Sequence, residues 1–194
     1  MVMERRFHMI VKMGYNLMRV NHKIHTLSAL CLFFFLLSFN IGIAQDLKLE
    51  EVRKKYPLAT TDEVVCNELY NALKGKADGT DILLGYAGGV TMLKAKYTAN
   101  PFSKLSYFNE GKQLLEDAIS NNKNNIELRF LRFAIQENLP AMLNYNDNLE
   151  EDKNYIMKYL PMLELRDFKK AIAFYLIKSE RTTEQEKAAL KKYE

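Results

Sequence analysis

Helical periodicity is the feature of this sequence that most constrains its fold. From about residue 47 to the C-terminus, apolar residues recur at steps of three and four, which places them on one face of an α-helix. No stretch of more than a few residues alternates as a β-strand would. Pro57, Pro101, Pro140 and Pro161 fall where we expect helices to begin or end, because proline disrupts a helix interior. The pattern predicts an all-α fold of helical hairpins, packed in a tetratricopeptide-like or irregular bundle.

Local signals predict where these helices begin and end. We expect the first helix to end before Pro57, Thr60 and Glu63 to form a capping box, and Ser103 to cap a later helix. Two glycines at 88–89 lie inside a helix, where each costs up to about 1 kcal/mol relative to alanine. Close approach of a neighbouring backbone would offset that cost. The expected helices cover residues 47–55, 61–74, 81–97, 103–119, 126–138, 150–159, 167–178 and 183–193, the last opened by a capping box of Thr183 and Glu186.

The inner faces of these helices follow from the same spacing. Residues Leu105, Phe108, Gly111, Leu115 and Ala118 are expected to form the inner face of the helix over 103–119. The segment 126–138 is apolar on two sides, through Ile126, Leu128, Phe130, Leu131, Phe133 and Ile135. A helix with two apolar sides must be covered on both of them, so we expect this helix to be central and the most buried.

Residues 1–44 have the features of an export signal. Basic residues precede an uncharged apolar run over 27–39, and small residues at Gly42 and Ala44 form a cleavage site. We expect cleavage after Ala44, which leaves a single helical domain over 45–194 in the periplasm or outside the cell. Met18 is better placed as the start of such a signal than Met1.

An uncleaved membrane anchor over residues 26–44 is the alternative for this segment. It has about the minimum length of a membrane-spanning helix. In that case the domain would stay attached to the membrane on its exported side.

The net positive charge of the chain comes from residues 1–44. Five of the 28 basic residues and one of the 24 acidic residues lie in residues 1–44, so 23 of each remain after cleavage. The balanced domain has no electrostatic footprint for nucleic acid. We also expect no strong association with an anionic membrane surface after cleavage.

The distribution of histidine and cysteine excludes several chemistries. His8, His22 and His25 all lie in the signal, so the domain has no histidine to activate a serine or cysteine nucleophile or to bind a metal. Cys66 is the one cysteine left after cleavage, which excludes an internal disulfide and a thiolate zinc site, and we expect it to be buried. We predict no cofactor, no metal site and no catalytic residue.

Three polar residues are the first choice for a binding site. Arg129, Arg132 and Gln136 are spaced i, i+3, i+7, so they share one edge of an otherwise apolar helix. One interpretation is that they pair with acids of a flanking helix. The other is that they bind a carboxylate or phosphate of a partner, for which a planar guanidinium is well suited.

Two resemblances bear on fold and location. Leu84-Gly85, followed by Gly111, Leu115 and Ala118-Ile119, resembles a tetratricopeptide-type helical hairpin. The stretches 107–112 and 126–132 are similar to an uncharacterised family of exported bacterial helical proteins. The resemblance implies export and a helical fold, and it assigns no catalytic residue.

The predicted function is protein binding or scaffolding rather than catalysis. We expect the partner to be another envelope or secreted protein, and no oligomeric state is predicted. One alternative is a binder of a small molecule or lipid, with a pocket between helices lined by Tyr86, Tyr97, Tyr107 and nearby phenylalanines. A hydrolase that uses only carboxylates is the remaining alternative, because two positioned acids suffice for glycoside cleavage.

Overall fold

A computed structural model describes residues 48–75 and 80–194 of the chain. In these residues the structure has no β-strand, which confirms the predicted all-α fold. The α-helices are α2 (Leu49–Ala59), α3 (Glu63–Leu73), α4 (Asp81–Tyr97), α5 (Pro101–Asn121), α6 (Ile126–Asn138), α7 (Leu149–Tyr159), α8 (Arg166–Lys178) and α9 (Glu184–Leu190). Short 3-10 helices are η2 (Ala141–Leu143), η3 (Leu160–Met162) and η4 (Lys191–Tyr193).

The export signal expected at residues 1–44 and the alternative anchor over 26–44 lie outside the described residues. In the part of the chain that the structure describes, no helix combines the length and the apolar character needed to cross a membrane. Residues 47–194 form one compact unit with two apolar clusters, so we expect this part to fold by itself.

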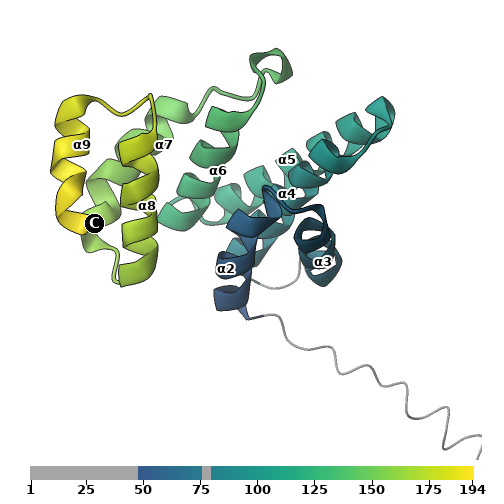
Figure 1. The fold of residues 1–194 in the computed structure, drawn as a ribbon, viewed down its shortest axis with the longest axis horizontal. Helices are drawn as coiled ribbons and strands as arrows, with labels where there is room; N and C mark the ends of the chain where they lie inside the picture. Colours follow the sequence, from purple (N-terminus) through teal and green to yellow (C-terminus); the bar gives the residue numbers. More distant parts are fainter. Residues whose placement is uncertain (1–47, 76–79) are drawn as a thin grey trace, which may run out of the picture. The chain divides into compact units, whose positions relative to one another are not determined.

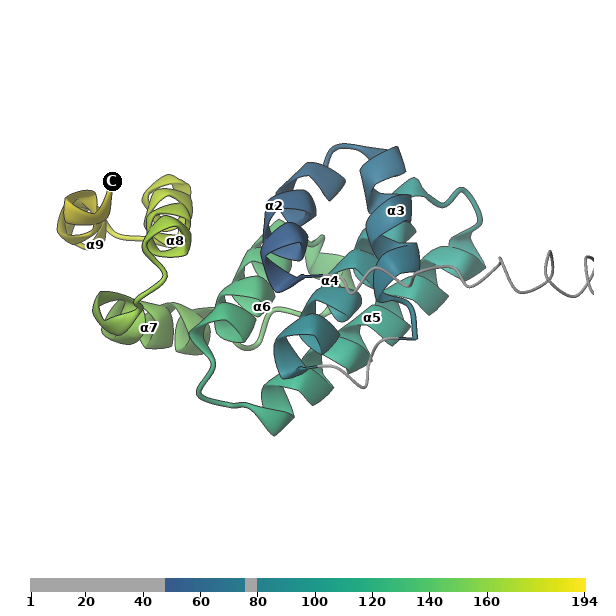
Figure 2. The same cartoon turned by 90° about the horizontal axis from the view of Figure 1, so that it is seen from below.

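The helices pack as successive hairpins. Contacts join α2 with α3, α4 with α5, α6 with α7, and α8 with α9 (Figure 1). The first helices of neighbouring hairpins also touch, since α4 contacts both α2 and α6. In both views α6 lies between the α4–α5 hairpin and α7 (Figure 2).

Two apolar clusters form the core, and α6 contributes to both. Leu128 and Leu131 of α6 belong to the larger cluster, which α2, α3, α4 and α5 complete. Phe133 of α6 is fully buried in the second cluster, with α7, α8 and α9. The prediction that 126–138 is a central helix is therefore confirmed. Phe130 is only half-buried, and it packs edge-on against Phe168 and Tyr175 of α8.

Glycine allows α4 and α5 to approach closely. A Cβ atom added at Gly88 would lie 2.6 Å from the carbonyl oxygen of Gly111, and one added at Gly111 would lie 2.5 Å from the carbonyl oxygen of Gly88. On the next position, a Cβ at Gly89 would lie 2.7 Å from Oη of Tyr56 in α2. The expected close approach of a neighbouring backbone is confirmed, and it explains glycine inside a helix.

Several helix ends match the sequence. Thr80 caps α4, Asn138 ends α6, and Thr183 and Glu186 form the capping box of α9 with both reciprocal bonds. Pro140 lies between α6 and η2, in agreement with its expected place at a helix boundary. These ends are set by side chains within four residues of the helix terminus, so local sequence suffices to locate them.

Other predicted ends are wrong. The helix α2 continues through Pro57 to Ala59, whose side chain is fully buried, because tertiary packing outweighs the lost backbone bond. The N-cap of α3 is Asp62, whose Oδ1 accepts from the backbone N–H groups of Val64 at 2.8 Å and Val65 at 3.2 Å. Thr60 instead donates through Oγ1 to the carbonyl of Pro57 at 2.6 Å.

The start of α5 is also earlier than predicted. Asn100 is its N-cap, and its Oδ1 accepts from the backbone N–H groups of Phe102 at 2.9 Å and Ser103 at 3.2 Å. Pro101 is the first helical residue, where proline is favoured because that N–H needs no helical partner. Ser103 therefore lies inside the first turn and does not cap the helix.

Candidate functional site

The predicted residue Arg132 is bound on two sides by carboxylates of the same chain. Its Nε and Nη2 atoms donate to Oδ2 and Oδ1 of Asp152 at 2.7 and 2.9 Å, and Nη1 donates to Oε2 of Glu116 at 2.8 Å. Arg132 and Asp152 are both buried. Burial opposes the charged guanidinium, but the bonds and charges of Asp152 and Glu116 outweigh it and raise the pKa of Arg132.

Arg129 extends the same cluster. Its Nη1 donates to Oε1 of Glu151 at 2.5 Å and to Oδ1 of Asp152 at 2.9 Å, and its guanidinium lies 4.8 Å from the ring centre of Tyr155. Desolvation lowers the pKa of Arg129, yet the two carboxylates raise it by more. Arg129 and Arg132 therefore hold the first turn of α7 against α6.

Gln136 lies at the other end of this row and is buried. Its Nε2 donates to Oδ1 of Asn148 at 3.2 Å, while Oε1 has no partner among the described residues. The structure thus brings the three predicted residues together on one side of α6. The two arginines pair with acids of the flanking helix α7, and Gln136 binds Asn148 just before that helix. The binding of an external anion by these residues stays a prediction.

Tyr145 links the cluster to α5. Its Oη donates to Oε1 of Glu116 at 2.5 Å, and its ring packs edge-on against Phe108. Burial, followed by the bond to Glu116, raises the pKa of this phenol.

The sequence contains a feature that could have indicated the pairing of Asp152. This residue shares one face of α7 with the apolar residues Leu149 and Ile156, at helical spacing. A carboxylate on an apolar face requires a cationic partner.

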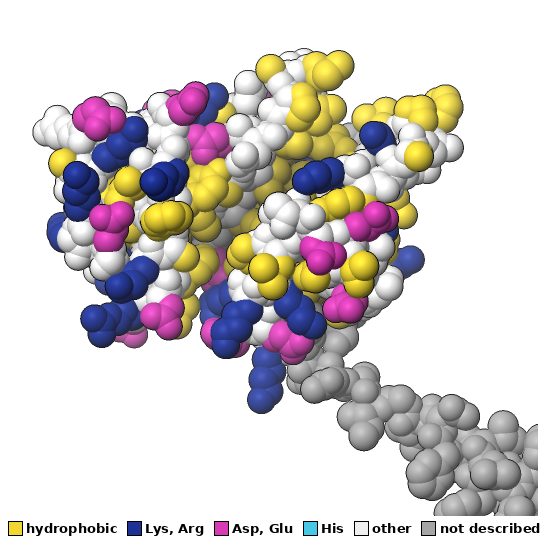
Figure 3. All heavy atoms as spheres, in the orientation of Figure 1, with side chains coloured by type: hydrophobic (Ala, Val, Ile, Leu, Met, Phe, Trp, Pro, Cys, Tyr) yellow, Lys and Arg dark blue, Asp and Glu magenta, His cyan; other side chains and the backbone are white. Residues whose placement is uncertain are grey.

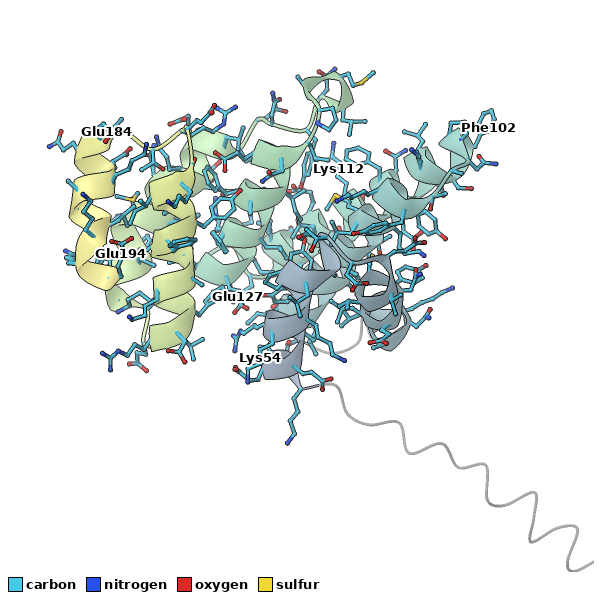
Figure 4. All side chains as sticks on the ribbon, viewed as in Figure 1. Lys54, Phe102, Lys112, Glu127, Glu184 and Glu194 are labelled. Carbon is cyan, nitrogen blue, oxygen red and sulfur yellow. The ribbon has the colours of Figure 1, made fainter. Side chains whose placement is uncertain are left out.

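A second ion-pair cluster, which the sequence did not predict, joins α2, α4 and α6. Arg53 donates through Nε and Nη2 to Oε1 and Oε2 of Glu127 at 2.8 and 2.6 Å, and Tyr86 Oη donates to Oε1 at 2.9 Å. The guanidinium of Arg53 also lies 5.7 Å from the ring centre of Phe168 in α8. Figure 4 labels Glu127 at the end of α6 that faces α2. Both clusters connect helices, and their arginines pair with carboxylates of the same chain.

The three tyrosines proposed to line a ligand pocket have separate surroundings. The Tyr86 hydroxyl binds Glu127, and the Tyr97 hydroxyl donates to the carbonyl of Ala59 at 3.1 Å. Tyr107 packs edge-on against Tyr70, with ring centres 6.0 Å apart. A surface depression is lined by other residues: Glu137, Asn138, Tyr175, Lys178, Ser179, Glu180 and Arg181. The lipid-binding alternative stays a prediction.

Three of the large apolar side chains that the fold leaves exposed lie where hairpins turn, and the others, Leu58, Val64, Met162, Leu165 and Phe174, lie elsewhere along the chain. Phe102 and Leu105, in the first two turns of α5, are 83% and 55% exposed, and Met142 in η2 is 86% exposed. Figure 3 shows apolar side chains gathered over η2 and over the α4–α5 turn along the upper edge. We call Phe102, Leu105 and Met142 the apolar rim. Leu105 was expected on the inner face of α5, and this expectation is wrong.

The reason for the exposure of Leu105 is a difference in helix length. The helix α5 has 21 residues, whereas its neighbour α6 has 13, so the α4–α5 hairpin projects past it (Figure 1). The Glu116 part of α5 is covered by Arg132 and Tyr145. Toward the N-terminus of α5 this cover ends, and the same helix face meets solvent.

Cys66 is fully buried, as expected, and burial raises the pKa of its thiol. Within residues 48–75 and 80–194 the structure has no group of three or more His, Cys, Asp or Glu side chains placed to hold a metal ion. Comparisons of the chain with protein-family models, with curated proteins and with solved structures found no match.

Proposed function

We propose that this protein is a protein-binding module and that the apolar rim is its binding surface. One observation carries the proposal: Phe102 and Met142 keep 83% and 86% of their surface in water at one edge of the molecule. Large apolar side chains that stay exposed at the surface of a folded domain are typical of an interaction site. Phenylalanine and methionine are also among the residue types enriched at protein interfaces.

The arrangement of hairpins supports the same proposal. Successive helical hairpins resemble tetratricopeptide-type repeats, and repeat proteins of this kind commonly bind other proteins along an extended surface. This support is an analogy at the level of fold. We further propose that residues 1–44 export the protein, so that its partner is another envelope or secreted protein.

The experiment compares two triple variants of residues 47–194 as baits for affinity capture from an envelope extract of the native cell. The rim variant carries Phe102→Ser, Leu105→Ser and Met142→Ser. The control carries Leu58→Ser, Val64→Ser and Phe174→Ser, at side chains that are 57%, 65% and 57% exposed elsewhere. Both variants are first checked by circular dichroism for the helicity of the wild type.

We expect the wild type and the control to retain the same partner and the rim variant to lose it. A partner that the rim variant still retains would place the binding surface elsewhere on the domain. Absence of any retained protein with all three baits would contradict protein binding itself.

A further inference from the structure

We propose that the apolar rim binds a segment of a partner protein that carries an acidic side chain beside its apolar ones, and that Lys112 pairs with this carboxylate. The inference rests on the proposed function and adds the chemistry of the partner.

One continuous face of α5 carries the surface. Phe102, Leu105, Asn109, Lys112 and Glu116 are spaced i, i+3, i+7, i+10, i+14, so they follow one another along the helix. Figure 4 labels Phe102 at the projecting end of the α4–α5 hairpin and Lys112 nearer the α6–α7 connection. This face of α5 is covered by other parts of the chain at Glu116 and is exposed to solvent at Phe102. Lys112 lies between the covered and the exposed part.

Lys112 is a cation without a carboxylate partner in the described residues. No Asp or Glu oxygen there lies within 4.0 Å of its Nζ, which instead lies 4.7 Å from the ring centre of Tyr145. The acid one turn further along the face, Glu116, already binds Arg132 and Tyr145. The side chain is half-buried, so its charge is partly withdrawn from water.

The surroundings of Lys112 favour an anion. Glu110 lies on the other side of α5, toward Tyr70 of α3, and so does not neutralise this face. A carboxylate placed over the rim would meet an unneutralised ammonium group beside an aromatic ring, where reduced contact with water strengthens the attraction. Apolar side chains of the partner would supply the binding free energy on Phe102, Leu105 and Met142, and the ion pair would set register and selectivity.

The shape of the surface favours a protein segment over a free fatty acid or lipid. The apolar side chains of the rim stand on two separate elements, α5 and η2. A lipid chain requires an enclosed apolar pocket, whereas an amphipathic helix or extended peptide can lay apolar side chains across both elements.

The test selects binding peptides from a display library of random 12-residue peptides, with residues 47–194 as the bait. Three baits are compared: the wild type, Lys112→Glu, and Lys123→Glu as a control with the same charge change at an exposed turn outside the rim. The rim variant described above serves as a fourth bait.

For the wild type and Lys123→Glu, we expect enrichment of peptides with Asp or Glu next to large apolar residues. With Lys112→Glu as the bait, we expect the selected peptides to carry Lys or Arg in place of that Asp or Glu. The strongest peptide from the wild type, measured by fluorescence anisotropy, should bind Lys112→Glu about tenfold more weakly or worse. The rim variant should select none of these peptides.

Two failures are distinguishable. Peptides that depend on the rim but show no acidic enrichment, or that bind Lys112→Glu unchanged, would overturn the role of Lys112 and leave the proposed function standing. Selection of the same peptides by the wild type and the rim variant, or of no peptides by any bait, would overturn both.

Discussion

Phe102 and Phe133 are the same residue type in opposite environments. Both lie in helices of the structure, yet Phe133 is fully buried in the second core cluster and Phe102, which the sequence placed before the predicted helix over 103–119, is 83% exposed. Which environment a phenylalanine meets depends on what packs over its helix face. The two residues therefore show at the residue scale how burial, and not residue type, determines a contribution to stability.

We predict that Phe133→Ala lowers the free energy of unfolding by about 3–5 kcal/mol, because it leaves a cavity between α6, α7 and α8. Phe102→Ala should change it by less than about 0.5 kcal/mol, as expected for an exposed side chain. Urea denaturation followed by circular dichroism measures both. Similar losses for the two variants would mean that Phe102 is covered within the monomer.

Helix ends depend on single side chains at the element scale. Asp62 accepts two backbone hydrogen bonds at the start of α3, whereas Thr60 binds only the carbonyl of Pro57 at the end of α2. Both residues have good capping propensity, and the sequence favoured Thr60 because Glu63 follows at capping-box spacing. The continuation of α2 to Ala59 leaves Thr60 as its C-cap, so it cannot open α3.

Asp62→Ala should therefore lower the free energy of unfolding by about 1 kcal/mol, since two backbone donors lose their acceptor. Thr60→Ala should cost less than about 0.5 kcal/mol, because its bond lies on the exposed surface. The comparison uses thermal or urea unfolding of residues 47–194. A larger loss of unfolding free energy for Thr60→Ala than for Asp62→Ala would mean that Thr60 caps α3.

At the scale of the whole molecule, α6 and two ion-pair clusters hold the hairpins together. Arg53 and Glu127 join α2 to α6, and Arg132 joins α6 to Glu116 of α5 as well as to Asp152 of α7. Two acidic side chains, Glu151 and Glu186, make the stability of the fold depend on pH. A hydrogen bond from Arg129 lowers the pKa of Glu151, and the backbone N–H of Thr183 lowers that of Glu186, both from 4.5.

A folded-state pKa below the unfolded value means that folding favours the carboxylate. The stabilisation is then complete above about pH 4.5 and is lost as the pH falls through the lowered folded-state pKa values. We predict that the double variant Glu151→Gln, Glu186→Gln is less stable than the wild type at pH 7. It should also lose less stability between pH 5 and pH 3, roughly the window in which such carboxylates titrate.

Urea midpoints measured from pH 7 to pH 3 test this prediction. The control is Glu164→Gln, Glu180→Gln, at two exposed acids that make no hydrogen bond or ion pair within the described residues. The expected effect is modest, because Glu151 is 61% exposed and solvent screens its pair with Arg129. Parallel curves for the wild type and the Glu151, Glu186 variant would contradict the prediction.

Local sequence determined the all-α fold, the bounds of α6, the capping box at Thr183, the burial of Cys66 and the glycine contact. The physical reason is that periodicity and capping act over a few residues. The exposure of Leu105 and the pairing of Arg53 with Glu127, 74 positions apart, were decided only by the tertiary structure. Helical spacing shows that a face is apolar, but the lengths and packing of neighbouring helices decide what covers it. For the same reason the sequence drew attention to Arg129 and Arg132, which the fold occupies with its own carboxylates, and not to the apolar rim.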